Sequence, residues 1–458
     1  MAADRPHGAF EVTDEDLIAQ IQARTFAGLV SATDRTSGLT ADRWPTPSAC
    51  SIAAVGFALT CWVAGASRGW MPRASAADLT ARALRTLETA PQGDAAEGVS
   101  GTRGWFYHFL NMQTGLRSGT CELSTIDTAL LLAGALTAAR YFDGLEPVEV
   151  EIRERTQRMM ARVDWAFALR PSGRFALGWS PERGFIPYEW GGYNEAMLLY
   201  VLALGAEGSP VPETAWEAWC ASYPKSWTTA PAPHLAFGPM FGHQYSQLWI
   251  DFRGVRDRFM REAGLDYFEN SRRAVLAQQA YASDNPGRWN GYGQDAWGLT
   301  ACDGPGQFTR LRGFSLKSFR AYSARGAWDF DDGTLAPTAV AASLPFAPEA
   351  VTSALRRMID DHGPAIYGPH GFQDAFNPSV DRAPPDHGEV KPMTGWVSRD
   401  MLGIDQGPIV AMIENHRSGL IWRLMREEPV IRRGLERAGF VGGWLQADNS
   451  VVTGPAGR

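Results

Sequence analysis

The chain has 458 residues, with 43 Lys or Arg against 50 Asp or Glu, and its formal net charge is −7. This mildly acidic balance without a basic cluster argues against a nucleic-acid partner, because such binding needs a concentrated basic surface. Seventeen Trp, 22 Phe, 48 Gly and 29 Pro indicate aromatic-rich, sharply turned loops. Such aromatic side chains either fill a large core or stack on sugar rings, and composition leaves both uses open.

Hydrophobic periodicity and helix start signals predict a chain of helices with few strands. The predicted helices are 13–30, 51–66, 74–89, the stretch after Asp127, 147–168, 194–204, 244–262, 267–284, 336–343, 347–360, 406–417, 419–426 and 428–436. A short hairpin is expected at 172–185. Residues 286–335 and 362–405 are expected to form loops.

This pattern fits two all-α architectures, an α-solenoid and a closed ring of helical hairpins, the (α/α)6 toroid. No fixed period of 30–45 residues is present, which argues against a solenoid. The long loops favour the ring, because loops beyond about 15 residues in a compact domain are usually functional. We therefore expect one catalytic (α/α)6-barrel domain over residues 1–458, with long aromatic-rich loops over one face.

The stretch 105–142 places two acids, Glu122 and Asp127, at the entrance of a helix that is apolar on nearly every face. Such a helix belongs deep in a large domain. Acids and aromatics at the rim of buried helices indicate a sugar site. Ser124 to Asp127 also matches S-x-x-D, so helix capping is an equal alternative for Asp127. Glu122 precedes the cap and has no such explanation.

A second cluster, YEWGGYNEAMLLY, contains Glu195 at the start of an apolar helix. The helix dipole favours a carboxylate there, while apolar neighbours raise its pKa, as a general acid requires. The alternative is an ordinary first-turn glutamate. The residues of this cluster that we expect to contact sugar are Tyr188, Trp190, Tyr193 and Asn194.

Two further acids stand out in the second half of the chain. Asp374 lies between two phenylalanines in a loop, where an acid has no obvious structural role, and Asp405 with Gln406 precedes a helix. Capping is the alternative for Asp405. The remaining candidates, Asp303, Asp331 and Asp332, are each followed closely by glycine, which is typical of ordinary turns.

The run FGPMFGHQYSQLWIDFRG contains His243, Gln244 and Tyr245, and Trp297 follows in a glycine-rich loop. No HxH, HExxH or EF-hand pattern accompanies them, so we expect no metal. Hydrogen bonds and stacking faces for sugar hydroxyls are the better interpretation. P-loop, GxGxxG and GxSxG motifs are also missing from the sequence, and we expect no cofactor.

Five scattered cysteines without a CxxC pair argue against a disulfide framework and a structural zinc site. No run of 18 apolar residues occurs, so we expect no membrane partner. The acidic first 16 residues lack the pattern of a signal peptide. The expected location is the cytoplasm, or the periplasm if a leader precedes this sequence.

Several runs, among them WFYHFLNMQTG, ELSTIDTALLLAGALTA, GYNEAMLLYVLALG, GPMFGHQYSQLWIDFRG, GFQDAFNPS and LGIDQGPIVAMIEN, resemble the glycoamylase-like family. That family includes bacterial β-1,2-glucanases and a domain of cyclic β-1,2-glucan synthases. The resemblance covers about residues 10–445 and implies an (α/α)6 barrel that acts on β-1,2-linked glucose. It also implies Glu195 as the acid and Asp127 and Asp374 as pocket carboxylates.

We therefore hypothesise an inverting glycoside hydrolase with Glu195 as general acid, Asp374 as base and Asp405 as the alternative base. Its expected partner is a β-1,2-glucan or oligosaccharide. The sequence leaves open a transglycosylase, an exo-acting enzyme on short substrates such as sophorose, and a non-catalytic glucan-binding protein. It also leaves open the oligomeric state.

Overall fold

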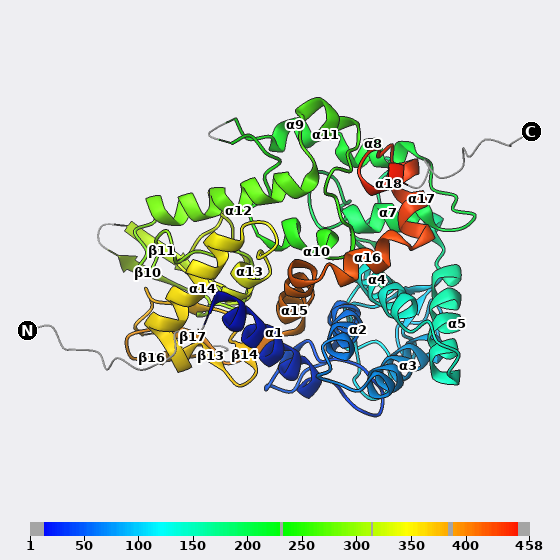
Figure 1. Ribbon diagram of the computed structural model, residues 1–458, viewed down its shortest axis with the longest axis horizontal. Helices are drawn as coiled ribbons and strands as arrows, with labels where there is room; N and C mark the ends of the chain where they lie inside the picture. The colour runs from blue at the N-terminus through cyan, green and yellow to red at the C-terminus, as the bar shows by residue number, and fades with distance from the viewer. Residues whose placement is uncertain (1–12, 230–231, 313–314, 383–387, 448–458) are drawn as a thin grey trace, which may run out of the picture.

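The computed structural model describes residues 13–229, 232–312, 315–382 and 388–447 (Figure 1). The helices are α1 (Asp14–Ser31), α2 (Ile52–Ser67), α3 (Arg73–Thr89), α4 (Thr125–Tyr141), α5 (Pro147–Arg162), α6 (Trp165–Ala168), α7 (Met197–Gly205), α8 (Thr214–Cys220), α9 (Tyr223–Ser226), α10 (Phe241–Trp249), α11 (Arg258–Ala263), α12 (Tyr267–Asp284), α13 (Pro337–Ala341), α14 (Pro348–His362), the 3-10 turn η1 (Gly363–Ala365), α15 (Gly403–Arg417), α16 (Leu420–Arg426), α17 (Pro429–Arg437) and α18 (Trp444–Ala447). The acidic residues 1–12, on which the expectation about a signal peptide partly rests, lie outside the described residues.

Six helices of the described chain form a closed inner ring. In ring order, α2, α4, α7, α10, α13 and α15 each contact the next, and α15 returns to α2. Figure 1 shows the orange α15 beside the blue α1 and α2, so the end of the chain closes against its beginning. The inner helices are buried on nearly every face, and every residue of α7 is buried. This is the environment that such helices require.

An outer layer covers this ring. Helices α1, α3, α5, α12, α14 and α17 pack on inner helices, and they carry one buried face each. The helices form an (α/α)6 toroid, which confirms the predicted fold class. No helix of the described ranges is long and apolar enough to cross a membrane.

The closest contact in the ring joins α2 and α4 at two glycines. A Cβ atom on Gly134 would lie 2.0 Å from the carbonyl oxygen of Gly56, and one on Gly56 would lie 2.4 Å from the carbonyl oxygen of Leu130. Side chains at these positions would push the two backbones apart. The glycines therefore set the spacing between α2 and α4, and the first turns of α4 border the site.

Short strands occur in the loops that connect the helices. They are β1 (Arg43–Trp44), β2 (Cys50–Ser51), β3 (Gly101–Thr102), β4 (Trp105–Phe106), β5 (Phe109–Leu110), β6 (Leu123–Ser124), β7 (Gly178–Ser180), β8 (Gly184–Phe185), β9 (Ala301–Cys302), β10 (Phe308–Arg312), β11 (Ser315–Phe319), β12 (Ser323–Ala324), β13 (Tyr367–Gly368), β14 (Gly371–Phe372), β15 (Phe376–Asn377), β16 (Gly388–Lys391), β17 (Gly395–Ser398) and β18 (Met401–Leu402). All the pairs among them are antiparallel. The pairs β1–β18 and β2–β5 bring segments from distant parts of the sequence to the starts of α15 and α2.

Two predicted helices are wrong because an aspartate cap interrupts each. The range 147–168 divides where Asp164 caps α6 by accepting a hydrogen bond from the backbone N–H of Phe167. The range 244–262 divides between α10 and α11, since Asp257 caps α11 and also accepts hydrogen bonds from Tyr267 and Trp216. The hairpin at 172–185 is confirmed as β7 and β8. The ranges 286–335 and 362–405 contain strands that the sequence pattern did not predict.

Candidate active site

The N-terminal ends of α4, α10 and α15 and the segment before α7 surround a cavity of about 360 Å³. That volume lies within the range of small-molecule sites. The lining residues are Asp42, Arg43, His108, Phe109, Ile126, Asp127, Leu130, Glu195, Phe241, Tyr245, Ala301, Tyr322, Leu402 and Ile404. Acidic, cationic and aromatic groups therefore face one enclosed space.

A larger hollow of about 500 Å³ lies between α4, α5 and α17. Its charged lining includes Arg140 and Glu428, which form an ion pair with an N–O distance of 2.7 Å, and Arg153, which donates to the carbonyl oxygens of Phe142 and Gly144. These charged side chains are already paired with one another or with backbone carbonyl oxygens. The smaller cavity, with its uncompensated buried carboxyl, is the candidate active site.

Glu195 is the uncompensated carboxyl. Only 8% of the residue is exposed, and its Oε2 has no hydrogen-bond partner in the described part of the chain. Burial, with a further contribution from the charge of Asp127, raises the pKa of Glu195 to about 7. The Ser246 hydroxyl donates to the Glu195 carbonyl oxygen over 2.7 Å, so α10 fixes the backbone of this segment. A carboxyl that keeps its proton near neutral pH can act as a general acid.

Asp127 faces the same cavity from the first turn of α4. Its backbone N–H donates to the Ser124 hydroxyl over 3.3 Å, and that hydroxyl also donates to the Asp127 carboxylate. The predicted capping role and the predicted pocket position therefore occur together. Asp127 and Glu195 are the two predicted catalytic residues that the fold brings to one cavity.

His108 links the acids at the entrance of α4. Its Nδ1 lies 2.9 Å from Glu122 Oε1, and its Nε2 lies 3.6 Å from Asp127 Oδ2. Burial alone lowers the pKa of His108, but the charges of Asp127, Glu122 and Asp42 reverse this effect and raise it to about 9. The imidazole is therefore a cation at neutral pH, and it orients both carboxylates.

Asp374 and Asp405 form a separate buried pair. The two carboxyl groups interact with each other, and Asp374 Oδ1 and Asp405 Oδ2 have no hydrogen-bond donor among the described residues. Burial, with the charge of Asp303, raises the pKa of Asp374 to about 7, and burial, with the charge of Asp374, raises the pKa of Asp405 well above its usual value. The Asp303 backbone N–H donates to Asp374 Oδ2 over 2.7 Å and fixes its orientation. Neither carboxyl lines the cavity, although Ile404, the neighbour of Asp405, does.

The pair is nevertheless close to the cavity wall. Burial first, and then the charge of Asp405, raises the pKa of Tyr245, which lines the cavity. The Tyr245 hydroxyl donates to the Ile404 carbonyl oxygen over 2.9 Å. The predicted base therefore lies behind the cavity wall, whereas the predicted acid, Glu195, lines the cavity itself.

Most of the other predicted sugar contacts lie outside the cavity lining. The Gln244 amide bridges α10 to α13 through Ala339 and Ser343, and that of Gln406 donates to the Phe372 carbonyl oxygen. These amides hold the ring together. Tyr245 alone among the predicted sugar contacts lines the cavity.

The aromatic candidates near Tyr193 belong to the core. The Tyr193 ring stacks on Tyr267 with centroids 5.9 Å apart and contacts His243. Burial lowers the pKa of His243 to about 3, and its Nε2 pairs with the Phe237 carbonyl oxygen. Trp297 is fully buried.

The remaining predicted sugar contacts, in the segment before α7 and at the entrance of α4, also lie outside the cavity lining. Tyr188 is 68% exposed, and the Trp190 indole donates to the Thr125 hydroxyl over 2.9 Å. Asn194 accepts from the Ala196 backbone N–H, and α7 therefore begins at Met197, later than predicted. Glu122 reaches the site through His108. Contact of these residues with sugar stays a prediction.

Four cavity residues, His108, Asp42, Arg43 and Tyr322, were not among the predicted sites. The Arg43 guanidinium donates to both carboxylate oxygens of Asp303, over 2.9 and 3.3 Å, and lies 3.4 Å from Asp400. The expectation that Asp303 forms only a turn is therefore wrong, because it is half of a buried ion pair. The aromatic run containing His108 was the one available signal in the sequence.

The Glycoamylase family model matches residues 187–429, which are more than half of the chain. The chain belongs to the glycoamylase family. Among curated proteins, this glycoamylase-family chain is similar to an exo β-1,2-glucooligosaccharide sophorohydrolase (non-reducing end) of Parabacteroides distasonis. The two are 28% identical over 93% of this chain, which spans 58% of the relative's length.

Solved structures give the same result. An endo-β-1,2-glucanase from Chitinophaga pinensis is 25% identical, covers 94% of this chain with its whole length and superposes with a TM-score of 0.79. A β-1,2-glucanase from Parabacteroides distasonis is 26% identical with a TM-score of 0.79, over 93% of this chain and 60% of its own. These similarities confirm the predicted resemblance of this glycoamylase-family chain to the bacterial β-1,2-glucanases.

Proposed function

We propose that this protein is a glycoside hydrolase that cleaves β-1,2-linked glucose chains, with Glu195 as the general acid. The observation that carries the proposal is the Glu195 carboxyl itself, which is buried, lacks a partner on Oε2 within the described residues and opens into the cavity. Its pKa of about 7 allows it to protonate a leaving glycosidic oxygen near neutral pH. The names of the similar glucanases support the β-1,2-linked substrate.

Hydrolysis needs a second carboxylate, and we propose Asp374 for this role, paired with Asp405. A pair of carboxyls that holds one proton keeps one negative charge, which can take a proton from an attacking water. Inversion, in which such a base activates a water on the face of the sugar opposite the acid, is the proposed outcome. Asp127, balanced by the His108 cation, would then stabilise positive charge on the sugar ring.

Asp127 is the alternative base, because its carboxylate lines the same cavity as Glu195. Asparagine variants at 127 and 374 discriminate between the two assignments. The variant that removes the base should lose about 10²–10⁴-fold in turnover, and the other should lose less.

The substrate is proposed to be a β-1,2-glucan or its oligosaccharides. The curated relative is named for release of sophorose from the non-reducing end, and this supports an exo-acting enzyme on short chains as a second candidate. Product sizes in the first minutes of digestion separate these modes. An exo enzyme releases one small product, whereas an endo enzyme yields a range of lengths.

The decisive experiment is product analysis on linear β-1,2-glucan and sophorose-series oligosaccharides, with anomer-resolved NMR. Glu195→Gln should lower turnover by at least ~10²-fold, the lower end for loss of a general acid. Glu189→Gln is the matched control, since Glu189 lies in the same segment and accepts a hydrogen bond from Ser172 outside the cavity. Oligosaccharide binding without any rise in reducing ends would instead indicate a glucan-binding protein.

A further inference from the structure

Tyr322 is the aromatic residue of the cavity wall with the largest unexplained exposure. It lies between β11 and β12, lines the cavity and is 46% exposed. Its hydroxyl has no hydrogen-bond partner within the described ranges, although the charges of Asp405, Asp374 and Asp42 act on it. A phenol with a free hydroxyl beside several carboxyls can donate to a sugar oxygen while its ring packs on the sugar.

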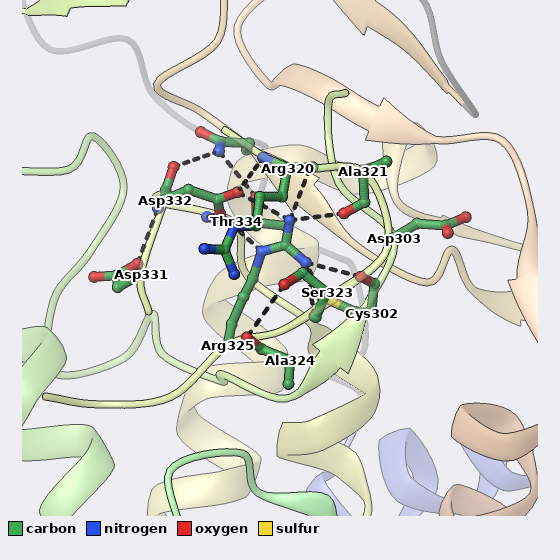
Figure 2. A network of polar contacts seen from close by, with 12 residues as sticks. Cys302, Asp303, Arg320, Ala321, Ser323, Ala324, Arg325, Asp331, Asp332 and Thr334 are labelled. Atoms are coloured by element: carbon green, nitrogen blue, oxygen red, sulfur yellow. Dashed lines mark hydrogen bonds and ion pairs between the residues drawn. The ribbon is translucent and has the colours of Figure 1, made fainter. Parts of the chain in front are cut away.

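The backbone on both sides of Tyr322 is held by one buried arginine. Figure 2 shows the Arg325 guanidinium in the middle of its polar contacts. It donates to the carbonyl oxygens of Arg320 and Ala321 over 3.0 and 3.1 Å, and to that of Ser323 over 3.0 Å. These three carbonyls belong to the two residues before Tyr322 and to the one after it.

Asp332 completes the arrangement. Its carboxylate accepts two hydrogen bonds from Arg325, over 2.8 and 2.9 Å, and a third from the Arg320 backbone N–H over 3.2 Å. Both side chains of the pair are fully buried. Burying two charges gives little net stability compared with an apolar pair, because desolvation offsets their attraction. The geometry that the pair imposes on the loop is the better explanation of its presence.

Two contacts connect this loop to the cavity and to the proposed base. Arg325 also donates to the Cys302 carbonyl oxygen over 2.8 Å, and Cys302 pairs with Ser323 across β9 and β12. The adjacent Ala301 lines the cavity. The Asn377 amide, three residues after Asp374, donates to the Asp332 carbonyl oxygen over 2.9 Å. The loop is therefore fixed relative to both.

We propose that Tyr322 contacts the sugar in the cavity and that the Arg325–Asp332 ion pair is the positioning device that holds it there. This inference rests on the proposed function and adds a specificity-determining residue to it. Arg325 does not touch the substrate, and its effect on catalysis passes through Tyr322.

Steady-state kinetics on a β-1,2-glucooligosaccharide test the proposal. Tyr322→Ala should raise KM about tenfold with a smaller change in kcat, the loss expected for one hydrogen bond and a ring contact. Tyr322→Phe should lose only the part due to the hydroxyl. Arg325→Lys should raise KM as Tyr322→Ala does, because lysine cannot reach all the carbonyls in the arginine fork.

A variant that combines Arg325→Lys with Tyr322→Ala tests whether Arg325 affects KM through Tyr322. If Arg325 acts through Tyr322, Arg325→Lys should add nothing to the KM of Tyr322→Ala. Multiplicative effects would show an independent structural role and overturn the positioning claim. Arg310→Lys is the matched control. Arg310 lies in β10 of the neighbouring β10–β11 hairpin and forms an ion pair with the exposed Asp381.

A second variant covers the case in which Arg325→Lys does not fold. A Cβ on Gly304 would lie 2.0 Å from Arg325 Nη2 and 2.3 Å from the Arg320 carbonyl oxygen, so Gly304→Ala disrupts the contact between these two groups without removing the charge. It should also raise KM. An unchanged KM in Tyr322→Ala, with normal wild-type hydrolysis, overturns this inference alone. Failure of the wild type to cleave any β-1,2-glucan overturns the proposed function and this inference with it.

Discussion

The Nε2 atom of His108 lies 3.6 Å from the Asp127 carboxylate at the edge of the cavity. The other ring nitrogen is 2.9 Å from Glu122, and the ring stacks on Phe109 with centroids 4.0 Å apart. A single cation thus sets the orientation of two acids that come from the entrance of α4. The relationship predicts how stability depends on pH.

We expect the stabilisation that His108 contributes to disappear in alkaline solution. Its pKa is raised from 6.5 to about 9 in the folded state. The contribution is therefore complete below pH 6.5 and is lost as the pH rises through about 9. Urea unfolding of the wild type and of His108→Gln should differ by up to ~3 kcal/mol at pH 6, and by much less at pH 9.5. An equal difference at both pH values would contradict the ion pair.

Glu195 should destabilise the fold at neutral pH, although catalysis requires it. Its pKa is raised from 4.5 to about 7, so the unfolded chain ionises first as the pH rises. The fold therefore loses stability between pH 4.5 and 7, by up to ~3 kcal/mol relative to Glu195→Gln. Wild-type kcat should fall above about pH 7 as the acid loses its proton. Chemical denaturation at pH 4.5 and 7.5, with a pH–rate profile, checks both statements.

The Asp374–Asp405 pair makes a third prediction. Asp405→Asn replaces a carboxyl whose pKa is raised well above its usual value with a neutral amide that can donate to Asp374, so the free energy of unfolding at pH 7 should rise by about 1–3 kcal/mol. Turnover should fall by at least ~10²-fold if the pair serves as base. Denaturant unfolding and initial rates on the same preparation measure both effects. A destabilised variant with normal turnover would refute the pair.

The glycine contact between α2 and α4 should control stability. Gly134→Ala places a methyl group 2.0 Å from the Gly56 carbonyl oxygen, so we expect a loss of at least ~1–3 kcal/mol, typical of overpacking. Gly293→Ala is the control, because a Cβ atom added at Gly293 would have no other heavy atom of the described residues within 4 Å beyond its chain neighbours. Thermal unfolding followed by circular dichroism compares the two.

The ring of helices could be predicted because burial is encoded locally. The ranges 51–66 and 267–284 show it best, since α2 spans Ile52–Ser67 and α12 spans Tyr267–Asp284. The loops between helices could not be predicted in this way. Strands of two to five residues, such as β1 and β18, carry too short a pattern and form through partners far away in the sequence.

The residues of the candidate site also differ in whether local sequence predicts them. Glu195 and Asp127 were found because an acid beside an apolar helix is visible within about ten residues of sequence. The aromatic cluster of Tyr193 and His243 gave a wrong indication, because an aromatic run has the same composition in a core and in a sugar site. Tyr322 had no distinguishing neighbours in the sequence.

By itself, the sequence determined which segments are buried helices and which acids begin them, since both follow from patterns within a few turns of chain. The tertiary structure alone decided which of these groups meet. Arg43 reaches Asp303 across 260 residues, and His108 joins Asp42 and Asp127. Such contacts depend on closure of the ring, and the pKa of a carboxyl depends on the charges and burial that this closure creates.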